Sequence, residues 1–222
     1  MRILAISAHP DDETLGCGGT LLKHRKRGDD VFWMIATQAH EPQWSVEEVG
    51  RKAREVDSVA RAFSVQELFR LGLPPGRVDT IPLTEIIEKM RGIIRATRPE
   101  IVYVVHGGDV HTDHQRVFAA TASAIKPIYM TRFGVRRVLS FETLSSTEAA
   151  APNAATLFAP TVFSDITPFI EQKISVMKLY ESELQDEPGP RSLSAVRALA
   201  RVRGGAIGVG YGEAFALMRE LI

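Results

Sequence analysis

Residues 2–8 read RILAISA, an apolar run that is too short for a helix and is predicted to be a buried strand. Residues 15–26 follow with apolar side chains at helical spacing, and they end in basic residues before Gly28, as helices commonly do. Residues 31–36 (VFWMIA) are a second short apolar run. Strand, helix and strand in this order predict two parallel strands joined by a right-handed crossover, which is the unit of an α/β sheet.

The alternation of strands and helices continues beyond this unit. Ser45 has the side chain of an N-cap, and Glu47 and Glu48 favour the first turn of a helix that we expect to reach Phe63. Later strands are expected at residues 65–71, 101–105, 136–141 and 156–163, later helices at 82–96, 112–125 and 168–183, and loops at 73–76 and 145–155. The chain is therefore predicted to be an α/β protein with a three-layer, Rossmann-like arrangement, in which a mostly parallel sheet carries helices on both faces.

The composition is that of an ordinary globular protein. The 222 residues include 27 Lys and Arg against 27 Asp and Glu, and 45% of them are hydrophobic. These values exclude a disordered, collagenous or coiled-coil chain, and the balanced charge argues against a nucleic-acid partner, which would need basic residues in surplus. We expect one domain over residues 1–222, because no change in composition marks a boundary. A net charge of zero also favours self-association, so a homo-oligomer is one expectation.

Cysteine content and targeting signals narrow the setting. Cys17 is the single cysteine of the sequence and is interpreted as a small buried hydrophobe, so the sequence allows no internal disulfide and no cysteine-rich zinc site. The apolar run at the N-terminus is too short for the core of a signal peptide. No stretch approaches the roughly 20 apolar residues of a membrane span. We expect a cytoplasmic protein without an integral membrane segment.

Metal-competent side chains follow two of the predicted strands. One group comes directly after the first strand, and the other lies in residues 106–114 (HGGDVHTDH), after the strand at 101–105. Ligands bind at the carboxyl ends of the strands in a parallel sheet, so the two groups are expected to meet at one edge of the sheet. The candidate set is His9, Asp11, Asp12, His111, Asp113 and His114.

The side chains of this set are of the types that bind zinc. A catalytic zinc keeps three protein ligands and one water, and two histidines with one carboxylate would meet that number. A second carboxylate could take a proton from the water, so the set indicates metal-assisted hydrolysis, although spacing leaves open which carboxylate does which job. The alternative for Asp11 or Asp12 is a plain helix N-cap. His24 and His40 are interpreted as solvated or locally hydrogen-bonded groups and not as ligands. His106 is an intermediate case, because it follows the strand end but could also be buried and hydrogen-bonded to the backbone.

Two motifs carry a resemblance to a known family. AHPDDE at residues 8–13 together with HTDH at 111–114 resembles the LmbE-like (PIG-L) family of zinc N-deacetylases, which act on N-acetylglucosaminyl-phosphatidylinositol and on precursors of mycothiol and bacillithiol. The likeness extends to Glu55, to FRLGLP at 69–74 and to GYGEAF at 210–215. It implies a small-molecule N-acetyl sugar conjugate as the substrate and one zinc ion per chain as the cofactor.

The resemblance also implies roles for individual residues. The zinc ligands of the family correspond to His9, Asp12 and His114. Asp11 would be the general base that activates the zinc-bound water, and His111 would stabilise the oxyanion and protonate the departing amine. Asp113 would orient His111 or raise its basicity, as a carboxylate partner does for an imidazole.

Other residues near this site are weaker indicators of function. Arg51 and Trp44 are candidate substrate contacts, but Arg51 could simply pair with Glu55 one turn on, and Trp44 could be a hydrophobic staple at the helix start. Residues 16–19 (GCGG) lack the later glycine and the lysine of phosphate-binding loops, so close helix packing is the favoured interpretation. Many family members have an acidic residue where this chain has Pro75, so substrate orientation is expected to differ.

Three functions are compatible with these sequence features to different degrees. The leading one is a zinc-dependent hydrolase that removes acetyl from an N-acetylated amino sugar or its conjugate. A magnesium-dependent phosphohydrolase is disfavoured because Mg²⁺ prefers oxygen ligands and the cluster contains three histidines. A non-catalytic sugar- or nucleotide-binding module is disfavoured by Asp11 and His111, because a binding protein needs neither a base nor an oxyanion donor.

Overall fold

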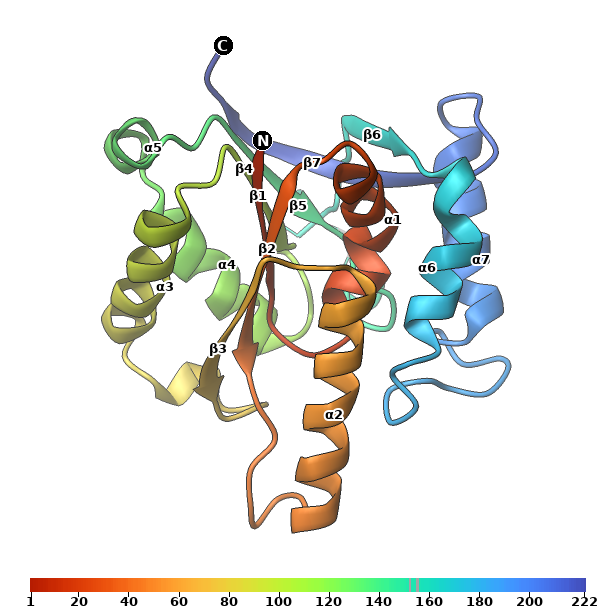
Figure 1. Ribbon diagram of the computed structural model, residues 1–222, viewed down its shortest axis with the longest axis horizontal. Helices are drawn as coiled ribbons and strands as arrows, with labels where there is room; N and C mark the ends of the chain where they lie inside the picture. The colour runs from red at the N-terminus through yellow and green to blue at the C-terminus, as the bar shows by residue number, and fades with distance from the viewer. Residues whose placement is uncertain (152, 155) are drawn as a thin grey trace.

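The computed structural model describes residues 1–151, 153–154 and 156–222, and these fold around one mixed sheet (Figure 1). The order of the seven strands is β3-β2-β1-β4-β5-β7-β6 in this described part of the chain. The strands are β1 (Arg2–Ser7), β2 (Asp30–Thr37), β3 (Glu67–Leu73), β4 (Ile101–Val105), β5 (Arg137–Phe141), β6 (Val162–Asp165) and β7 (Gly212–Glu220).

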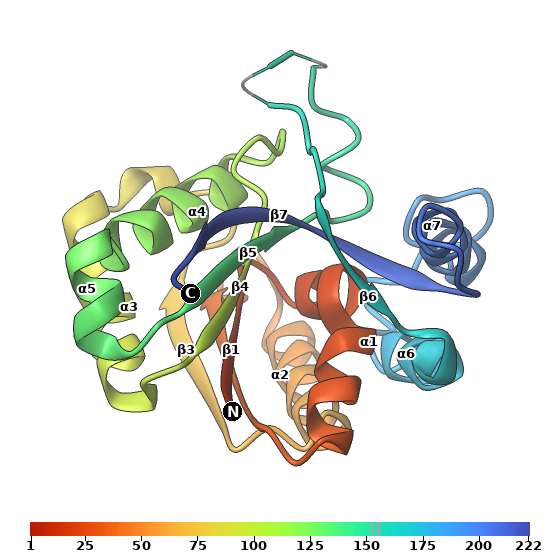
Figure 2. The ribbon, with the colours of Figure 1, turned by 90° about the horizontal axis from the view of Figure 1, so that it is seen from above.

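Helices cover both faces of the sheet, as the sequence predicts (Figure 2). They are α1 (Asp12–Lys26), α2 (Val46–Ala62), α3 (Leu83–Thr97), α4 (Thr112–Ala124), α5 (Pro127–Phe133), α6 (Ile170–Met177) and α7 (Leu193–Gly205). α3, α4 and α5 lie on one face, and α1, α2 and α6 lie on the other. The predicted three-layer α/β architecture is therefore confirmed.

β1 lies in the middle of the parallel part of the sheet. It pairs in parallel with β2 through Ile3↔Val31 and with β4 through Ile3↔Ile101. Both faces of β1 are covered, so Ile3 and Ile6 have no exposed surface, which explains the uninterrupted apolar run. The chain goes from β1 to β2 on one side and later returns to β4 on the other, so a topological switch point lies between β1 and β4.

The second half of the chain differs from the expectations. α5, α7 and β7 do not stand out in the sequence, and β7 pairs antiparallel with both β5 and β6. The strand expected at 156–163 is found at Val162–Asp165, and the helix expected to reach residue 183 ends at Met177. Tyr180 explains the early end, because its buried hydroxyl donates a 2.8 Å hydrogen bond to Glu13 Oε1 in α1 and draws the chain out of the helix.

The glycine-rich segment of α1 packs closely on the sheet, as expected. A Cβ on Gly16 would lie 2.0 Å from Phe141 Cδ2, and one on Gly19 would lie 2.8 Å from Ile166 Cδ1. Cys17 between them is fully buried. α1 begins at Asp12, so this close packing positions its first turn beside the carboxyl ends of the strands.

A buried ion pair holds the C-terminal half against α1. Glu213 of β7 accepts hydrogen bonds from the backbone N–H groups of Gly19 and Thr20, both at 2.8 Å. Lys173 of α6 donates to the same carboxylate at 2.7 Å and to the Leu15 carbonyl at 2.8 Å. β7, α6 and α1 therefore form one connected unit behind the strand ends.

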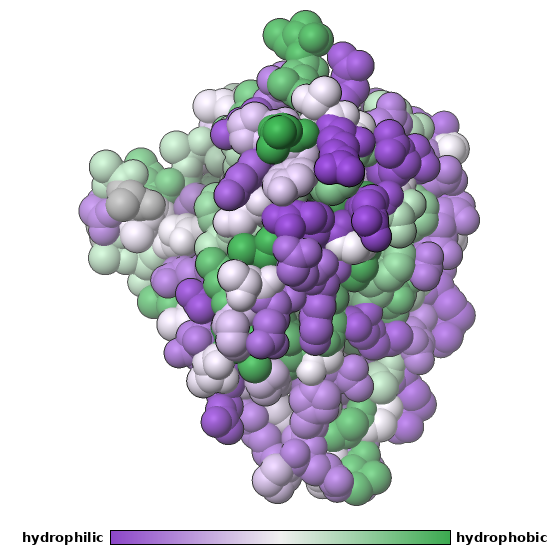
Figure 3. All heavy atoms as spheres, turned by 90° about the vertical axis from the view of Figure 1, so that its left-hand side faces the viewer, coloured by the Kyte–Doolittle hydropathy of each residue, from purple (hydrophilic) through white to green (hydrophobic). Residues whose placement is uncertain are grey.

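The outer surface that carries α3 and α5 is mainly hydrophilic (Figure 3). On the face that carries α3 and α5, hydrophilic side chains predominate and apolar ones lie scattered between them (Figure 3). Among the described residues, no helix is both long and apolar enough to cross a lipid bilayer. Of the loop expected at 145–155, residues 145–150, 153 and 154 form turns and bends, and Pro152 and Ala155 lie outside the described residues.

Candidate active site

The carboxyl ends of β1 and β4 open into a pocket of about 450 Å³. The connection from β1 to α1 brings His9, Asp11 and Asp12 to it, and the first turn of α4 brings His111 and His114. The segments that the sequence places after two separate strands thus meet at the switch point of the sheet.

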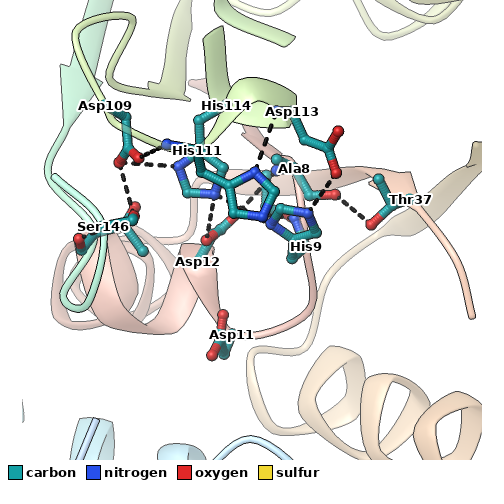
Figure 4. A network of polar contacts seen from close by, with 12 residues as sticks. Ala8, His9, Asp11, Asp12, Thr37, Asp109, His111, Asp113, His114 and Ser146 are labelled. Carbon is teal, nitrogen blue, oxygen red and sulfur yellow. Dashed lines mark hydrogen bonds and ion pairs between the residues drawn. The ribbon is translucent and has the colours of Figure 1, made fainter. Parts of the chain in front are cut away.

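His9, Asp12 and His114 point one ligand atom each toward a common centre (Figure 4). These atoms all lie within 4.8 Å of one another. His9 Nδ1 is 3.1 Å from His114 Nε2, and His114 Nε2 is 3.3 Å from Asp12 Oδ1. Two imidazole nitrogens facing each other beside a carboxylate form a donor set that fits a tetrahedral zinc with a remaining open position.

Asp12 is held firmly in this arrangement. Its Oδ2 accepts hydrogen bonds from the backbone N–H groups of Ala8 at 2.8 Å and His9 at 2.7 Å. Burial opposes ionisation, but His114 and His9 outweigh it and lower the pKa of Asp12 to about 2. The carboxylate is therefore ionised at neutral pH, as a metal ligand must be.

Each of the two histidines has a carboxylate behind it. His9 Nε2 is 2.9 Å from Asp113 Oδ2, and His114 Nδ1 is 3.1 Å from Asp109 Oδ2 (Figure 4). Such partners fix the orientation and tautomer of an imidazole and increase its basicity toward a metal. The opposite nitrogens, His9 Nδ1 and His114 Nε2, are then the ones that face the centre.

The two carboxylates are anchored by different loops. Asp113 accepts from the backbone N–H of Gly76 at 2.6 Å and of Val78 at 3.1 Å, both after β3. Asp109 accepts from the hydroxyls of Ser146 at 2.8 Å and Thr147 at 2.6 Å, both after β5. The sequence pattern does not single out Asp109, although its place in the same segment as His111 and His114 is a usable signal.

The expectation that the Asp113 carboxylate orients His111 is wrong. The carboxylate lies against His9 instead. The reason is that the side chain of Asp113 turns toward the loop at Gly76 and Val78, whose N–H groups hold it there. The contact with His111 is made by the Asp113 backbone N–H, 3.2 Å from His111 Nδ1.

This backbone contact decides the hydrogen-bonding state of His111. Nδ1 accepts the Asp113 N–H, so the ring proton of the neutral imidazole lies on Nε2. Burial, together with the nearby His9 and His114, lowers the pKa of His111. His111 is thus a neutral hydrogen-bond donor in the pocket.

His114 shows how strongly the centre favours positive charge. Burial works against the charged ring, but Asp12 and Asp109 outweigh burial and raise the pKa of His114 to about 10. A divalent cation would provide the same compensation for these two carboxylates in place of a proton.

Asp11 stands apart from the ligand set. Its side chain is buried and makes no capping hydrogen bond to α1, so the N-cap interpretation is wrong for this residue. Its backbone has a φ of 94°, which is sterically unfavourable for a residue with a side chain. Burial, followed by the neighbouring Asp12, raises the pKa of Asp11 well above the ordinary value. A carboxylate of this kind suits a general base.

The family model described as "PIG-L: GlcNAc-PI de-N-acetylase" matches residues 4–125, more than half of the chain and both candidate motifs. The chain belongs to the PIG-L family. This confirms the predicted family, and with it the reaction class of amide hydrolysis at an N-acetyl group.

Relatives of this PIG-L protein carry deacetylase names. An uncharacterized deacetylase of Escherichia coli, YaiS, is 26% identical and aligns with 81% of this chain and 90% of its own length. A 1D-myo-inositol 2-acetamido-2-deoxy-alpha-D-glucopyranoside deacetylase of a Mycobacterium species (strain JLS) is 25% identical over 90% of this chain and 79% of its own. The solved structure of N,N'-diacetylchitobiose deacetylase from Pyrococcus horikoshii shares the fold, with a TM-score of 0.79, 22% identity and coverage of 98% of this chain and 84% of its own.

Only one of the two candidate substrate contacts lies at this PIG-L pocket. Trp44 lines it, whereas Arg51 is exposed and is not among the lining residues. The expected pair of Arg51 with Glu55 is wrong, because both oxygens of Glu55 accept hydrogen bonds from Ser182, Oε2 from the hydroxyl at 2.6 Å. The adjacent Lys52 faces the pocket instead, one position along the helix.

The histidines outside the PIG-L cluster have local partners. His24 is buried between Asp29 and Tyr103, with ring nitrogens 2.7 Å and 3.0 Å from them. His40 Nε2 is 3.1 Å from the Gly72 carbonyl, and His106 Nε2 is 3.2 Å from the Thr156 carbonyl. The interpretation of His24 and His40 as locally bonded groups is confirmed.

Proposed function

We propose that the protein is a zinc-dependent N-deacetylase, which hydrolyses the acetamide of an N-acetylated amino sugar or its conjugate to acetate and a free amine. The observation that carries this proposal is the convergence of two histidines and one carboxylate beside a separate buried carboxylate, Asp11, in one pocket. The separate carboxylate favours a hydrolase over a binding module.

His9 Nδ1, Asp12 and His114 Nε2 would hold the metal, in line with the donor set that the predicted zinc requires. Zinc is favoured over magnesium because two of the three donors are nitrogen atoms. When bound, zinc supplies a Lewis acid that polarises the acetamide carbonyl and acidifies a water molecule.

Asp11 is the proposed base. It accepts a proton from the water as the oxygen attacks the carbonyl carbon, and its raised pKa brings its basicity closer to what a proton transfer near neutral pH needs. The carboxyl proton on Asp11, in place of one from His111 as the resemblance implies, then supplies the hydrogen that the departing nitrogen requires. The products are a carboxylic acid and an amine, so atoms and charge balance.

His111 is the proposed oxyanion donor. Its Nε2–H is directed to donate because Nδ1 already accepts the Asp113 N–H. A fixed donor aimed at the carbonyl oxygen stabilises the charge that develops there without reorganisation.

The class of substrate is proposed from the relatives. One is named for an acetamido-deoxy-glucopyranoside joined to inositol, and the structural neighbour is named for diacetylchitobiose. An acetylated amino sugar is common to both names. Cytoplasmic location, self-association and the extent of one domain over residues 1–222 stay predictions.

Acetate release from N-acetylglucosamine, diacetylchitobiose and glycosides of N-acetylglucosamine tests the proposal. We expect chelation to abolish release, zinc to restore it, and Asp11→Asn to lower turnover by about 10²- to 10³-fold while the protein still binds zinc. Hydrolysis that survives complete metal removal, or an Asp11→Asn enzyme of near-native activity, would overturn it.

A further inference from the structure

We infer that the amino-sugar substrate carries an uncharged, apolar group at its anomeric carbon, and that one face of α2 receives this group. The inference rests on the proposed function and adds the substrate class. It comes from the wall of the pocket that the proposed chemistry does not use.

This wall is a stripe of apolar side chains along α2. Val49, Ala53 and Val56 are spaced by four and three residues, so they lie on one face of the helix, and all three line the pocket that also contains Asp11. Ile35 at the end of β2 extends the stripe toward the sheet. These four apolar side chains therefore line the same pocket as the candidate metal ligands.

The stripe continues past the sheet. The N-terminal turns of α2 extend beyond the carboxyl ends of the strands (Figure 1). Val56 is buried, whereas Val49 and Trp44 are half-buried, so apolar surface becomes accessible toward the start of the helix. The pocket therefore has room for an apolar group on the side of Trp44.

The charges around the pocket argue against an anionic group. Among the described lining residues, each Lys and Arg already has a carboxylate partner. Lys52 pairs with Glu183, and Arg191 lies 3.2 Å from Asp11 Oδ2. Arg70 Nη2 lies 2.6 Å from Asp57 Oδ1. An anionic group on the substrate would compete with these carboxylates for Lys52, Arg70 and Arg191, whereas an apolar group would leave the pairs intact.

The experiment compares kcat/KM for acetate release from methyl, butyl and phenyl N-acetylglucosaminides and from N-acetylglucosamine 1-phosphate. Each methylene buried on the stripe is worth a factor of about four, so we expect the phenyl glycoside to exceed the methyl glycoside by at least about tenfold. The 1-phosphate is expected to be no better than the methyl glycoside.

A variant pair on α2 ties the preference to the stripe. Val49→Asp is expected to bring the phenyl-to-methyl ratio close to one. Val46→Asp, three residues earlier and 72% exposed outside the pocket lining, is the matched control and is expected to keep the wild-type ratio. The wild-type glycoside series is informative even where Val49→Asp fails to fold.

The outcomes separate this inference from the proposed function. Acetate release from none of the compounds would contradict the proposed function itself. Release from all of them with a wild-type phenyl-to-methyl ratio near one, or with the 1-phosphate preferred, would contradict the apolar subsite and leave the deacetylase proposal standing.

Discussion

Arg191 Nη1 lies 3.2 Å from Asp11 Oδ2, although 180 positions separate the two residues in the chain. Arg191 belongs to the connection between α6 and α7, and the same nitrogen is 3.6 Å from Glu183 Oε2. Glu183 in turn contacts Lys52 of α2. A row of alternating charges thus connects α2, the α6–α7 connection and the proposed base.

Arg191→Ala is expected to lower kcat by about 10- to 100-fold with little change in KM, because a displaced catalytic group costs turnover more than binding. Arg191→Lys should recover part of the loss by restoring the charge. Steady-state kinetics on an N-acetylglucosaminide measures both variants. Arg197→Ala, which removes a surface pair with Glu171, is the control. An Arg191→Ala enzyme with native kcat would show that Asp11 needs no positioning.

His111→Gln should reduce kcat by about 10²- to 10³-fold, the usual cost of losing an oxyanion donor. His111 is not one of the three proposed ligands, so the zinc content, measured by elemental analysis, should remain that of the wild type. Loss of zinc in this variant would instead assign His111 to the metal, together with His9 and Asp113, which form the other set of converging ligand atoms.

Asp113→Asn and Asp109→Asn should each weaken zinc binding by about 10- to 100-fold, because each removes the charged partner of one proposed ligand. Competition with a chromogenic chelator measures the affinity. The exposed Asp186 provides the comparison variant, Asp186→Asn, which should bind zinc as the wild type does. Native affinity in both Asp113→Asn and Asp109→Asn would contradict the proposed ligand set.

His24 makes the stability of the fold depend on pH. Burial lowers the pKa of His24 below 6.5 despite the Asp29 carboxylate beside it. Below pH 6.5 the unfolded chain therefore binds more protons than the folded one, and the free energy of unfolding falls as the pH falls toward the folded pKa.

Urea unfolding of chelated protein between pH 7.5 and 5 measures this dependence. A single proton contributes a slope of at most about 1.4 kcal/mol per pH unit, and His24→Gln should remove its contribution. Identical slopes in the two proteins would mean that His24 is protonated in the folded state as well. Comparing the two proteins cancels the contributions of the other histidines.

The parallel half of the fold is predictable because its signals are local. Apolar runs such as 31–36 are buried within the sheet, and Ser45 is the N-cap of α2 as expected, in a capping box with Glu48. β7 is different, since it joins the sheet between β5 and β6, and this position depends on contacts with distant segments. The early end of α6 likewise depends on Tyr180 reaching Glu13, which no local pattern indicates.

The candidate site divides in the same way. The placement of His9, Asp12 and His114 at adjoining strand ends follows from the order of strands and helices. The partners of these residues do not, because side-chain direction depends on loops such as the one at Gly76, which draws Asp113 to His9. Arg191 is one basic residue among many in the sequence, and its contact with Asp11 needs the folded α6–α7 connection.

The positive φ of Asp11 sets catalysis and folding in opposition at one position. Glycine adopts a φ of 94° without steric hindrance, whereas an aspartate held there destabilises the fold by about 1–3 kcal/mol. Asp11→Gly would also remove a buried carboxylate. We expect this variant to be inactive and yet to melt at a higher temperature than the wild type when both are free of metal. The residue that suits the backbone best is therefore one with no side chain to carry out the reaction.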